Sequence, residues 1–283
     1  MENSPGMDEM LPRVREVEVK SVLTRSRLFP YCVNPYRGCA HACVYCYARF
    51  ATRFSHPHEA WGGYVDVRVN APEVLERQLT KAKPATVYMS SVCDAWQPLE
   101  ERYGVSRTCL ELLVGAGFPL FLQTKSTLVN RDLDVLAGRP NISLGVTITT
   151  VDRAAAALFE PGAALPSDRL QVVRNARAQG LSTFVFVGPL LPGVSDGGEG
   201  LRAVFESVAA VQPDRLFVDR LNRRTGMWPD VRAAVSALDV DLVPEYQRIL
   251  FSQQPREYES LLRKRVSDVA TAHGLLDRIE WCF

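Results

Sequence analysis

Short apolar segments alternate with amphipathic helical segments along most of the 283-residue chain, and this alternation predicts an α/β fold built on a parallel sheet. The expected strands, such as TVYMS at 86–90 and ISLGVTI at 142–148, are continuous apolar runs typical of strands buried on both faces. Glycines close several expected helices, as Gly117 and Gly138 do. No G-x-G-x-x-G motif follows a strand, so the chain lacks the fingerprint of a dinucleotide-binding fold.

The elements can be taken in order along the chain. Residues 1–12 are expected to be a disordered or loosely held start, and REVEVKSVL at 15–23 predicts a first short strand. The run after Cys46 is expected to begin a helix, and residues 230–275 to be helical and amphipathic. Between them, helices are predicted at 71–82, 105–117, 128–138, 167–180 and 200–211, and strands at 86–90, 118–124, 142–148, 182–187 and 215–219.

Composition favours one large domain and gives no argument for a highly charged partner. The chain is 47% hydrophobic and 23% charged, with 33 basic and 32 acidic residues, for a net charge of +1. The N-terminal MENSPGMDEM is polar, and no apolar run reaches the roughly 18 residues of a membrane span, so neither a signal peptide nor a span is expected. Seven cysteines, an odd number, argue against a disulfide scaffold and favour a reducing compartment, which predicts a cytoplasmic protein.

The segment NPYRGCAHACVYCYAR at 34–49 carries the strongest chemical signal. Cys39, Cys43 and Cys46 follow a C-x3-C-x2-C spacing, and closely spaced thiolates on a loop are typical ligands of an iron-sulfur cluster. Three ligands for a four-iron cluster leave one iron without a protein partner, and an open metal position is typical of a catalytic site. The alternatives are a zinc site with Cys32 or His41 as the fourth ligand, or three buried free cysteines.

The stretch resembles the cluster loop of the radical S-adenosylmethionine (SAM) enzymes, whose signature is C-x3-C-x-aromatic-C, with Tyr45 as the aromatic residue. NPYRGC followed by CVYCYAR resembles, more narrowly, the spore photoproduct lyase-like branch. The resemblance continues in collinear order over roughly residues 30 to 195. It includes SSVCDAWQPLE (90–100), LQTKSTLVNRDLDVL (122–136), LGVTITT (144–150), FEP (159–161), SDRL (167–170) and VGPLLPG (187–193).

The resemblance implies a partial (β/α)6 TIM-like barrel of the radical SAM type with a C-terminal helical extension. The expected divisions are an N-terminal segment at 1–29, the core partial barrel at 30–230, and a helical extension at 231–283 packed on the core. In such barrels the chemistry lies at the C-terminal ends of the strands. The cysteine loop, Asp94, Lys125, Thr147 and Pro189 all fall at or just after the end of a predicted strand, so they are expected at one mouth.

The resemblance also implies the cofactors and the reaction. Cys39, Cys43 and Cys46 would hold a 4Fe-4S cluster that cleaves SAM reductively, and the 5'-deoxyadenosyl radical would abstract hydrogen from an organic substrate such as a nucleoside, sugar or natural-product intermediate. A reductase, flavodoxin or ferredoxin would supply the electron. One alternative is repair of a DNA photolesion, although the bulk charge does not favour nucleic acid. The alternative from another class is a non-catalytic iron-sulfur electron carrier.

Several residues are expected near the cofactors. In the branch that the chain resembles, tyrosines at the positions of Tyr45 and Tyr47 are linked to hydrogen-atom relay, and packing beside the cluster is the alternative. Asp94 is expected to take hydrogen bonds from the cofactor's amino group or from substrate, with a helix N-cap as the alternative. Lys125 and Ser126 match the branch's cofactor-binding lysine region, where a lysine neutralises the methionine carboxylate, unless Lys125 is simply solvated.

Two hydroxyls and one carboxylate complete the expected cofactor-binding set. Thr147 and Thr149 lie at the end of a strand, where they suit ribose or carboxylate contact, although polar strand ends are also ordinary. Glu160 in FEP and Arg169 in SDRL are expected to form a supporting pair under the cofactor, and surface helix charges are the alternative.

A cysteine at the second strand is the candidate hydrogen donor. In the lyase branch a cysteine three residues before the corresponding aspartate returns hydrogen to the product radical, and alignment on Asp94 puts Ser91 there. Cys93 would share a face with Ser91 if the strand persists, so it is the candidate catalytic thiol, displaced by two residues; a buried structural cysteine is the alternative.

Arginines and a terminal cysteine stand apart from the motif series. Arg220, Arg223 and Arg224 follow the last predicted strand and suggest an anionic group on the substrate, with a solvated basic loop as the alternative. Cys109 lies on an apolar helix face and is expected in the core. Cys282, next to the last residue, belongs either to an anchored or frayed terminus or to a tail that folds over the mouth.

Overall fold

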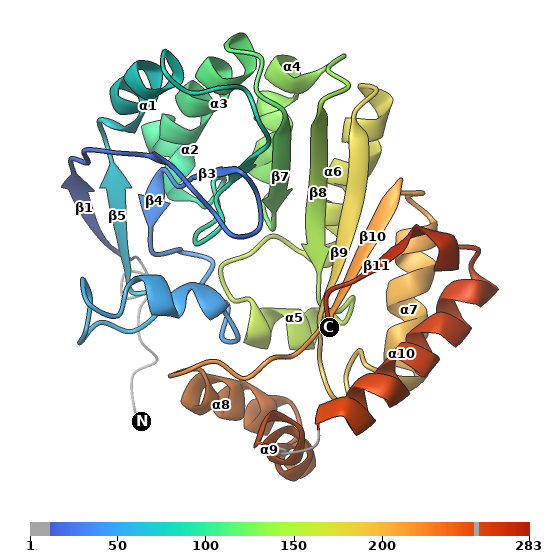
Figure 1. The fold of residues 1–283 in the computed structure, drawn as a ribbon. Helices are drawn as coiled ribbons and strands as arrows, with labels where there is room; N and C mark the ends of the chain where they lie inside the picture. The colour runs from blue at the N-terminus through green and yellow to red at the C-terminus, as the bar shows by residue number, and fades with distance from the viewer. Residues whose placement is uncertain (1–11, 252–254) are drawn as a thin grey trace.

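A computed structural model describes residues 12–251 and 255–283, so all but the last residue of the expected loose start at 1–12 lies outside the described residues. Its main sheet has eight strands (Figure 1). Neighbouring strands pair in parallel except in the β2–β3 hairpin. From one edge to the other the strands are β11 (Ile279–Trp281), β10 (Arg215–Arg220), β9 (Ser182–Leu190), β8 (Ile142–Ile148), β7 (Leu120–Thr124), β6 (Val87–Met89), β3 (Tyr31–Val33) and β2 (Leu23–Thr24).

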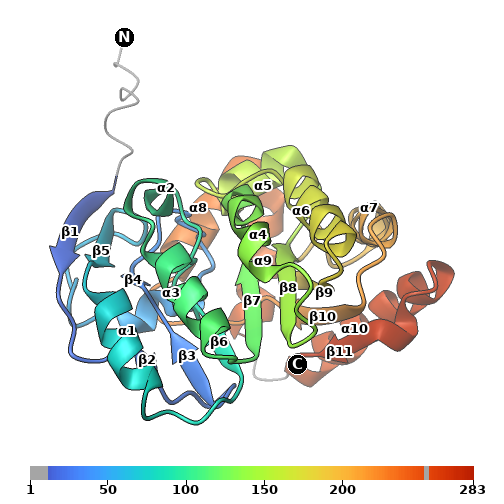
Figure 2. The same cartoon turned by 90° about the horizontal axis from the view of Figure 1, so that it is seen from above.

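Helices cover the outer face of this sheet, as Figures 1 and 2 show from two directions. The apolar faces of α1, α3, α6 and α7 supply much of the buried core behind the strands. The helices are α1 (Ala71–Leu79), α2 (Leu99–Tyr103), α3 (Val105–Gly115), α4 (Leu133–Leu136), α5 (Arg153–Phe159), α6 (Pro166–Ala178), α7 (Gly198–Ala209), α8 (Trp228–Leu238), α9 (Val243–Phe251) and α10 (Pro255–Ala272).

A second, three-stranded sheet flanks the cysteine loop. Its strands, in order, are β1 (Arg13–Val17), β5 (Tyr64–Arg68) and β4 (Tyr36–Arg37), with β1 and β5 parallel and β4 antiparallel to β5. The cysteine loop leaves β4 and passes into a 3-10 helix, Tyr47–Ala51, before the chain returns along β5. This small sheet therefore holds both ends of the segment that carries the cysteines.

The predicted α/β fold with a mostly parallel sheet is confirmed. β3, β6, β7, β8, β9 and β10 supply six parallel strands, and α1, α3, α4, α6, α7 and α8 follow them. Within the described part of the chain the sheet is open, because β2 and β11 each pair on one side only. The division of the chain at residues 29 and 230 stays a prediction.

Three details of the predicted elements are wrong. The expected strand at 15–23 is two separate strands, β1 and β2, and the expected helix after Cys46 is a single 3-10 segment. The strand predicted at 86–90 stops at Met89, because Ser90 has a φ of +67°, which turns the chain out of the extended conformation. Beyond residue 275, where the expected helical segment ends, β11 adds to the sheet beside β10.

An aromatic stack closes the inner face of the sheet below the site. The rings of Phe121 and Phe184 lie 4.3 Å apart and nearly parallel, and Phe217 meets each of them edge-on. Gly145, on the strand between Phe121 and Phe184, makes this possible, because a Cβ there would lie 2.3 Å from the Phe184 ring. The strands therefore form a packed floor at this level.

The last helix is fastened to the loop between β9 and α7. Tyr258 on α10 donates a hydrogen bond to Asp196 Oδ2 at 2.9 Å, and Arg265 Nη1 lies 3.5 Å from the same oxygen.

No helix in the described ranges is both long and apolar enough to cross a membrane.

Candidate functional site

The backbone of the cysteine loop is fixed by hydrogen bonds to two separate parts of the chain, at Gln97 and at residues 159–162. Ala40 N donates to Gln97 Oε1 at 2.9 Å, Val44 N donates to the carbonyl of Phe159 at 3.0 Å, and the carbonyl of His41 accepts from Gly162 N at 3.0 Å. Tight turns within the loop accompany these contacts, since Ala42 has a φ of +53°. The loop is therefore held in one shape from outside as well as by its own turns.

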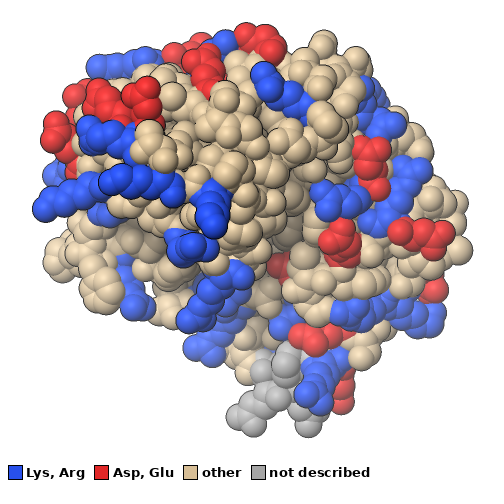
Figure 3. Space-filling view, turned by 45° about the horizontal axis from the view of Figure 1, so that its top comes forward, with Lys and Arg blue, Asp and Glu red and all other residues tan. Residues whose placement is uncertain are grey.

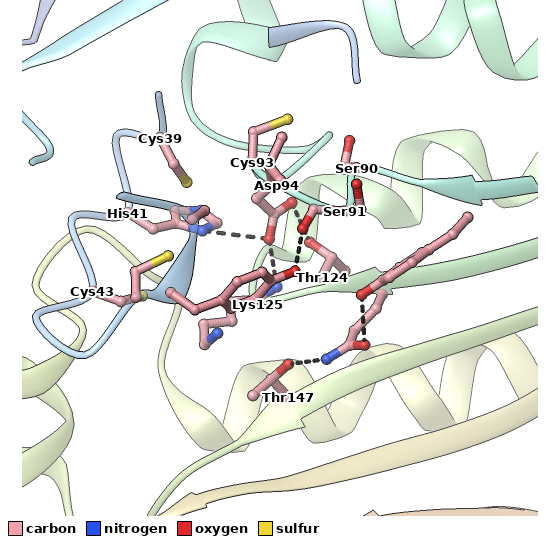
Figure 4. A pocket seen from close by; sticks show the side chains of 16 residues that line it. Cys39, His41, Cys43, Ser90, Ser91, Cys93, Asp94, Thr124, Lys125 and Thr147 are labelled. Atoms are coloured by element: carbon pink, nitrogen blue, oxygen red, sulfur yellow. Dashed lines mark hydrogen bonds and ion pairs between the residues drawn. The ribbon is translucent and has the colours of Figure 1, made fainter. Parts of the chain in front are cut away.

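The three cysteines of the motif line one cavity together. It has a volume of about 540 Å³ and lies where the C-terminal ends of β6, β7 and β8 meet the loop (Figure 4). Burial raises the pKa of Cys43 to about 12, with Glu160 and Cys46 adding to the shift against the opposing charge of Lys125. Cys32, the proposed fourth zinc ligand, instead places Sγ 3.2 Å from Thr24 Oγ1 and does not line this cavity.

Nor does the described part of the chain contain three His, Cys, Asp or Glu side chains placed to hold a single metal ion. His41, the other proposed fourth zinc ligand, turns its Nδ1 to Asp94 Oδ2 at 3.4 Å. Three thiols that share a cavity without converging on one point match the donor set of a multi-iron cluster, in which different irons take different thiolates.

Asp94 ties three elements together at the edge of the cavity. Oδ1 accepts from Trp96 N at 2.9 Å and from the Thr124 hydroxyl at 2.7 Å, while Oδ2 accepts from Lys125 N at 2.8 Å and faces His41. Burial alone would raise the pKa of Asp94, but His41 and these hydrogen bonds outweigh it and lower the pKa to about 2. The N-cap alternative does not apply to α2, whose N-cap residue is Pro98.

A buried ionic network lies behind Tyr45. The Tyr45 hydroxyl donates to Glu160 Oε1, the Thr149 hydroxyl lies 2.8 Å from the same oxygen, and Arg169 Nη2 lies 2.5 Å from Glu160 Oε2. Burial would raise the pKa of Glu160, but Arg169 and Lys125 outweigh it and hold the pKa below its usual value. The predicted pairing of Glu160 with Arg169 is confirmed.

Lys125 lies between the two groups of residues. Its backbone N–H binds Asp94, and its Nζ is 5.6 Å from the centre of the Tyr45 ring. Burial would lower the pKa of Lys125, but Cys43 and Glu160 raise it above its usual value, so the side chain is a cation in the cavity.

A row of polar side chains crosses the inner face of three neighbouring strands; Thr147 was predicted from the sequence, whereas Tyr88 and Gln123 were missed. Tyr88 on β6 donates to Gln123 Oε1 at 3.0 Å, and Gln123 on β7 donates to Thr147 Oγ1 on β8 at 2.9 Å (Figure 4). All three line the cavity. Alternation along the strands could have found Gln123, because it lies two residues before Lys125 and so faces the same side.

The two tyrosines beside Cys46 differ in burial. Tyr45 is buried, whereas Tyr47 is 43% exposed and donates its hydroxyl to the carbonyl of Ser91. Cys93 and Ser91 both line the cavity, although the strand does not persist to them. Cys93 Sγ lies 3.9 Å from Asn34 Oδ1, and burial raises its pKa to about 11, so it is held as the thiol.

A larger hollow of about 1180 Å³ continues from this cavity along β9 and β10. The two share part of their lining, including Tyr47, Gln123, Lys125 and Thr147, and the larger one extends to Asp219. Burial raises the pKa of Asp219 above its usual value against hydrogen bonds from Arg220 N and Asn222 Nδ2.

The three arginines after β10 have different surroundings. Arg220 Nη2 lies 2.8 Å from Glu259 Oε1 on α10, and Arg223 stacks on the Phe251 ring. Arg224 is exposed, and both it and Arg220 line the larger hollow. Cys282 lines this hollow too, because its N–H binds the carbonyl of Val218 and anchors the tail.

Three of the residues that were expected to contact a cofactor line neither the cysteine cavity nor the larger hollow. Thr149 and Glu160 belong to the network behind Tyr45, and Ser126 accepts a hydrogen bond from Leu128 N at the start of a 3-10 helix. Their direct contact with a cofactor stays a prediction.

Comparison with known proteins agrees with this architecture. An uncharacterised protein of Mycobacterium tuberculosis is 30% identical over 256 residues, which cover 87% of this chain and 75% of that protein. A protein of Pseudomonas phage M6 named radical SAM Nalpha-GlyT isomerase is 24% identical over 257 residues, covering 85% and 52%.

A spore photoproduct lyase mutant solved with bound AdoMet and dinucleoside spore photoproduct has the same fold, with a TM-score of 0.69 at 14% identity, covering 100% of this chain and 87% of that one. The family model described as the Radical SAM superfamily matches residues 33–235. The chain belongs to the Radical SAM superfamily and is an enzyme, with a 4Fe-4S cluster and S-adenosylmethionine as its cofactors and a reductant as its requirement.

Proposed function

We propose that this enzyme cleaves SAM reductively and takes a hydrogen atom from a small organic substrate, such as a nucleoside, a sugar or a natural-product intermediate. The observation that carries the proposal is the single cavity lined by three motif thiols on one side and by Asp94 and Lys125 on the other. The adjoining hollow offers space for a second molecule beside the cofactors.

Cys39, Cys43 and Cys46 fit the cluster. They share one wall, the loop that carries them is fixed from outside, and the chain supplies no fourth thiol from Cys32. When bound, the cluster and SAM supply a reductive cleavage whose product, a 5'-deoxyadenosyl radical, removes hydrogen from unactivated carbon.

Lys125 is the residue we assign to the SAM carboxylate. Its ammonium group is in the cavity and is held beside the Tyr45 ring, where a point charge neutralises a carboxylate without a fixed hydrogen-bond geometry. The buried Glu160–Arg169 pair holds Tyr45 from behind and so fixes the surface on which Lys125 rests.

Asp94 we assign to positioning. Three hydrogen-bond donors and His41 already occupy the four acceptor positions of its carboxylate, so little capacity remains for a ligand. Its role is to hold His41 on the cysteine loop in a fixed position relative to Lys125, the residue that follows β7. The row of Tyr88, Gln123 and Thr147 adds hydrogen-bonding groups to the lining of the cavity that also holds Lys125.

On the substrate side, Tyr47 and Cys93 are the candidates for relay and return of hydrogen. Both line the cavity, and the Tyr47 hydroxyl is bound to the carbonyl of Ser91, two residues from Cys93. A thiol that returns hydrogen suits an isomerase or lyase-like outcome, and the phage relative carries an isomerase name.

Arg224 extends this substrate side. It lines the larger hollow with its guanidinium exposed, so an anionic group on the substrate would meet it there. Arg220 is committed to Glu259, so of the three arginines Arg224 is the one that we assign to this contact.

DNA photolesion repair is the second candidate, and Ser91 argues against it. The thiol that the lyase branch needs would lie at residue 91, where the chain has a hydroxyl in the cavity. An electron carrier, the third reading, would not need the polar row or Lys125.

The test is anaerobic reconstitution with iron and sulfide, followed by reduction with dithionite in the presence of SAM. We expect close to four irons per chain and formation of 5'-deoxyadenosine and methionine, both detected by mass spectrometry. Cys43→Ala should abolish both, whereas Cys109→Ala, a change in the core on α3, should keep both. Stoichiometric zinc with negligible iron, or a reducible cluster that never cleaves SAM, would refute the proposal.

A further inference from the structure

Beside the last cysteine of the motif, the surface carries exposed aromatic rings and arginines. Phe50 is 57% exposed and Phe54 85% exposed, and the Arg53 guanidinium lies 4.6 Å from the centre of the Phe54 ring. Exposed phenylalanines are costly to leave in water, and Phe and Arg are enriched at protein interfaces. Phe50, Arg53 and Phe54 are named here the arginine–aromatic patch.

The patch borders a hollow of about 820 Å³. Phe50 and Arg53 of the patch line it together with Tyr47, Arg49, Arg224 and Thr225, and none of the described Asp or Glu residues lines it. Arg and Lys side chains also border the crevice in the middle of the face seen in Figure 3. The local surface is therefore positive, although the whole chain has a net charge of only +1.

The hollow and the cysteine cavity adjoin at Tyr47. Tyr47 lines both, it follows Cys46 directly in the chain, and its ring lies 6.2 Å from the Phe50 ring. Arg49 braces the segment, since its Nη2 donates to the carbonyl of Val44 in the cysteine loop and its Nη1 lies 2.5 Å from Asp230. The patch is thus rigidly connected to the loop.

We infer that the arginine–aromatic patch is the docking surface for an acidic one-electron redox protein. The inference rests on the proposed function, because a reductive cleavage needs one electron from outside. One electron would pass from the reduced donor to the cluster that Cys39, Cys43 and Cys46 would hold, with no bond or proton exchanged. The patch places the donor beside Tyr47 and Cys46, on the surface next to the cysteine wall.

The size and charge of the patch favour a protein over nucleic acid. Nucleic-acid readers carry an extended basic stripe and typically a pI above about 9, whereas the pI of this chain is about 7.6. Redox complexes are small, often under about 1,200 Å² of buried surface, and are guided by complementary charge. A few arginines around exposed phenylalanines match this kind of transient interface.

The experiment uses the reconstituted enzyme and a purified acidic flavodoxin as the probe. Binding of oxidised flavodoxin is measured by titration calorimetry at low and high salt, separately from catalysis. SAM cleavage is then measured with dithionite and, in parallel, with reduced flavodoxin. Arg53→Glu should weaken binding by about tenfold and slow flavodoxin-driven cleavage to match, because it reverses a charge at the interface.

Dithionite-driven cleavage should be unchanged in Arg53→Glu, because dithionite needs no docking surface. Phe54→Ser should weaken binding several-fold without a change in salt dependence. Arg102→Glu is the matched control, because Arg102 on α2 is also exposed and stacks on an aromatic ring, that of Tyr103, at 5.1 Å. It should bind flavodoxin like the unaltered chain.

Equal flavodoxin binding by Arg53→Glu and the unaltered chain would overturn the inference. So would binding of a single-stranded DNA oligonucleotide, sensitive to Arg53→Glu, in a chain that does not bind flavodoxin. If dithionite produced no cleavage at all, the proposed function would fail, while the binding titrations would still decide whether the patch docks the flavodoxin.

Discussion

His41 Nδ1 lies 3.4 Å from Asp94 Oδ2, so the middle of the cysteine loop touches the carboxylate that follows β6. Both side chains are buried. The contact makes the position of the loop depend on a group whose other hydrogen bonds come from β7, Lys125 and Trp96. The cysteine loop and the ends of β6 and β7 are therefore joined through Asp94 into one structural unit.

Asp94→Asn should make the free energy of unfolding less dependent on pH in the acid range. The folded pKa of Asp94, about 2, lies below its ordinary 3.8, so its stabilising contribution is complete above that ordinary value and is lost as the pH falls toward 2. The unaltered chain should lose about 2 kcal/mol more than the variant between pH 5 and pH 2, measured by urea unfolding. Glu101→Gln, which removes an exposed carboxylate on α2, is the control for loss of one charge. If the free energy of unfolding fell with pH equally in Asp94→Asn and in the unaltered chain, the low pKa assigned to Asp94 would be contradicted.

Glu160→Gln should be far more damaging than Tyr45→Phe. The first change leaves the Arg169 guanidinium, 1% exposed, without its anion and should cost about 3–5 kcal/mol of unfolding free energy. The second removes one hydroxyl donor and should cost about 1 kcal/mol. Thermal and urea unfolding of the two variants would show the difference. If both variants lost a similar amount of unfolding free energy, the Glu160–Arg169 ion pair would stabilise the fold little more than the Tyr45 hydroxyl does.

His56→Ala should loosen the segment that carries the arginine–aromatic patch. His56 is buried, its Nε2 lies 2.9 Å from Asp66 Oδ2, its Nδ1 contacts Glu59, and its ring stacks on Tyr64 at 3.8 Å. Removing it leaves the buried Asp66 carboxylate without its main partner, at a cost of about 3 kcal/mol. Hydrogen exchange of residues 52–62 should rise.

The control lies two residues away. His58 is exposed, and His58→Ala should change stability by less than about 0.5 kcal/mol. Exchange that stays protected in His56→Ala would show that the segment is held by other contacts.

Cys93→Ala should change how the product acquires its final hydrogen. Cleavage of SAM should remain within about twofold of the unaltered rate, because Cys93 is not a motif cysteine. In deuterated water, the solvent label should be lost from the product or the product should change, as mass spectrometry would show. Cys282→Ala, which removes the thiol that lines the adjoining hollow, is the comparison. An unaltered product with an unaltered label in Cys93→Ala would assign that thiol to packing.

Most of the fold, and the residues that form the main part of the cavity lining, could be predicted from the sequence. The strand expected at 142–148 is β8 residue for residue, and the expected 118–124 contains β7, because apolar runs and glycine ends leave little choice. The shared placement of the cysteines, Asp94, Lys125 and Thr147 followed from one rule, that parallel strands end at the same edge.

What could not be predicted depended on partners far away in the chain. The pairing of Arg220 with Glu259 is set by the packing of α10, and no local pattern announces it. Likewise, Asp94 was expected to contact a ligand, and only the fold shows that its carboxylate is surrounded by protein donors. The short strands β4 and β11 are two and three residues long, below the length at which periodicity is informative.

Gly145 and Phe184 also constrain how this protein can diverge. Any side chain at residue 145 meets the Phe184 ring, and any smaller group at 184 leaves an unfilled space above Gly145. Each single substitution is therefore harmful, while a larger residue at 145 combined with a smaller one at 184 restores the filled volume. Residues 145 and 184 are therefore expected to covary, so that related chains with a larger residue at 145 should have a smaller one at 184.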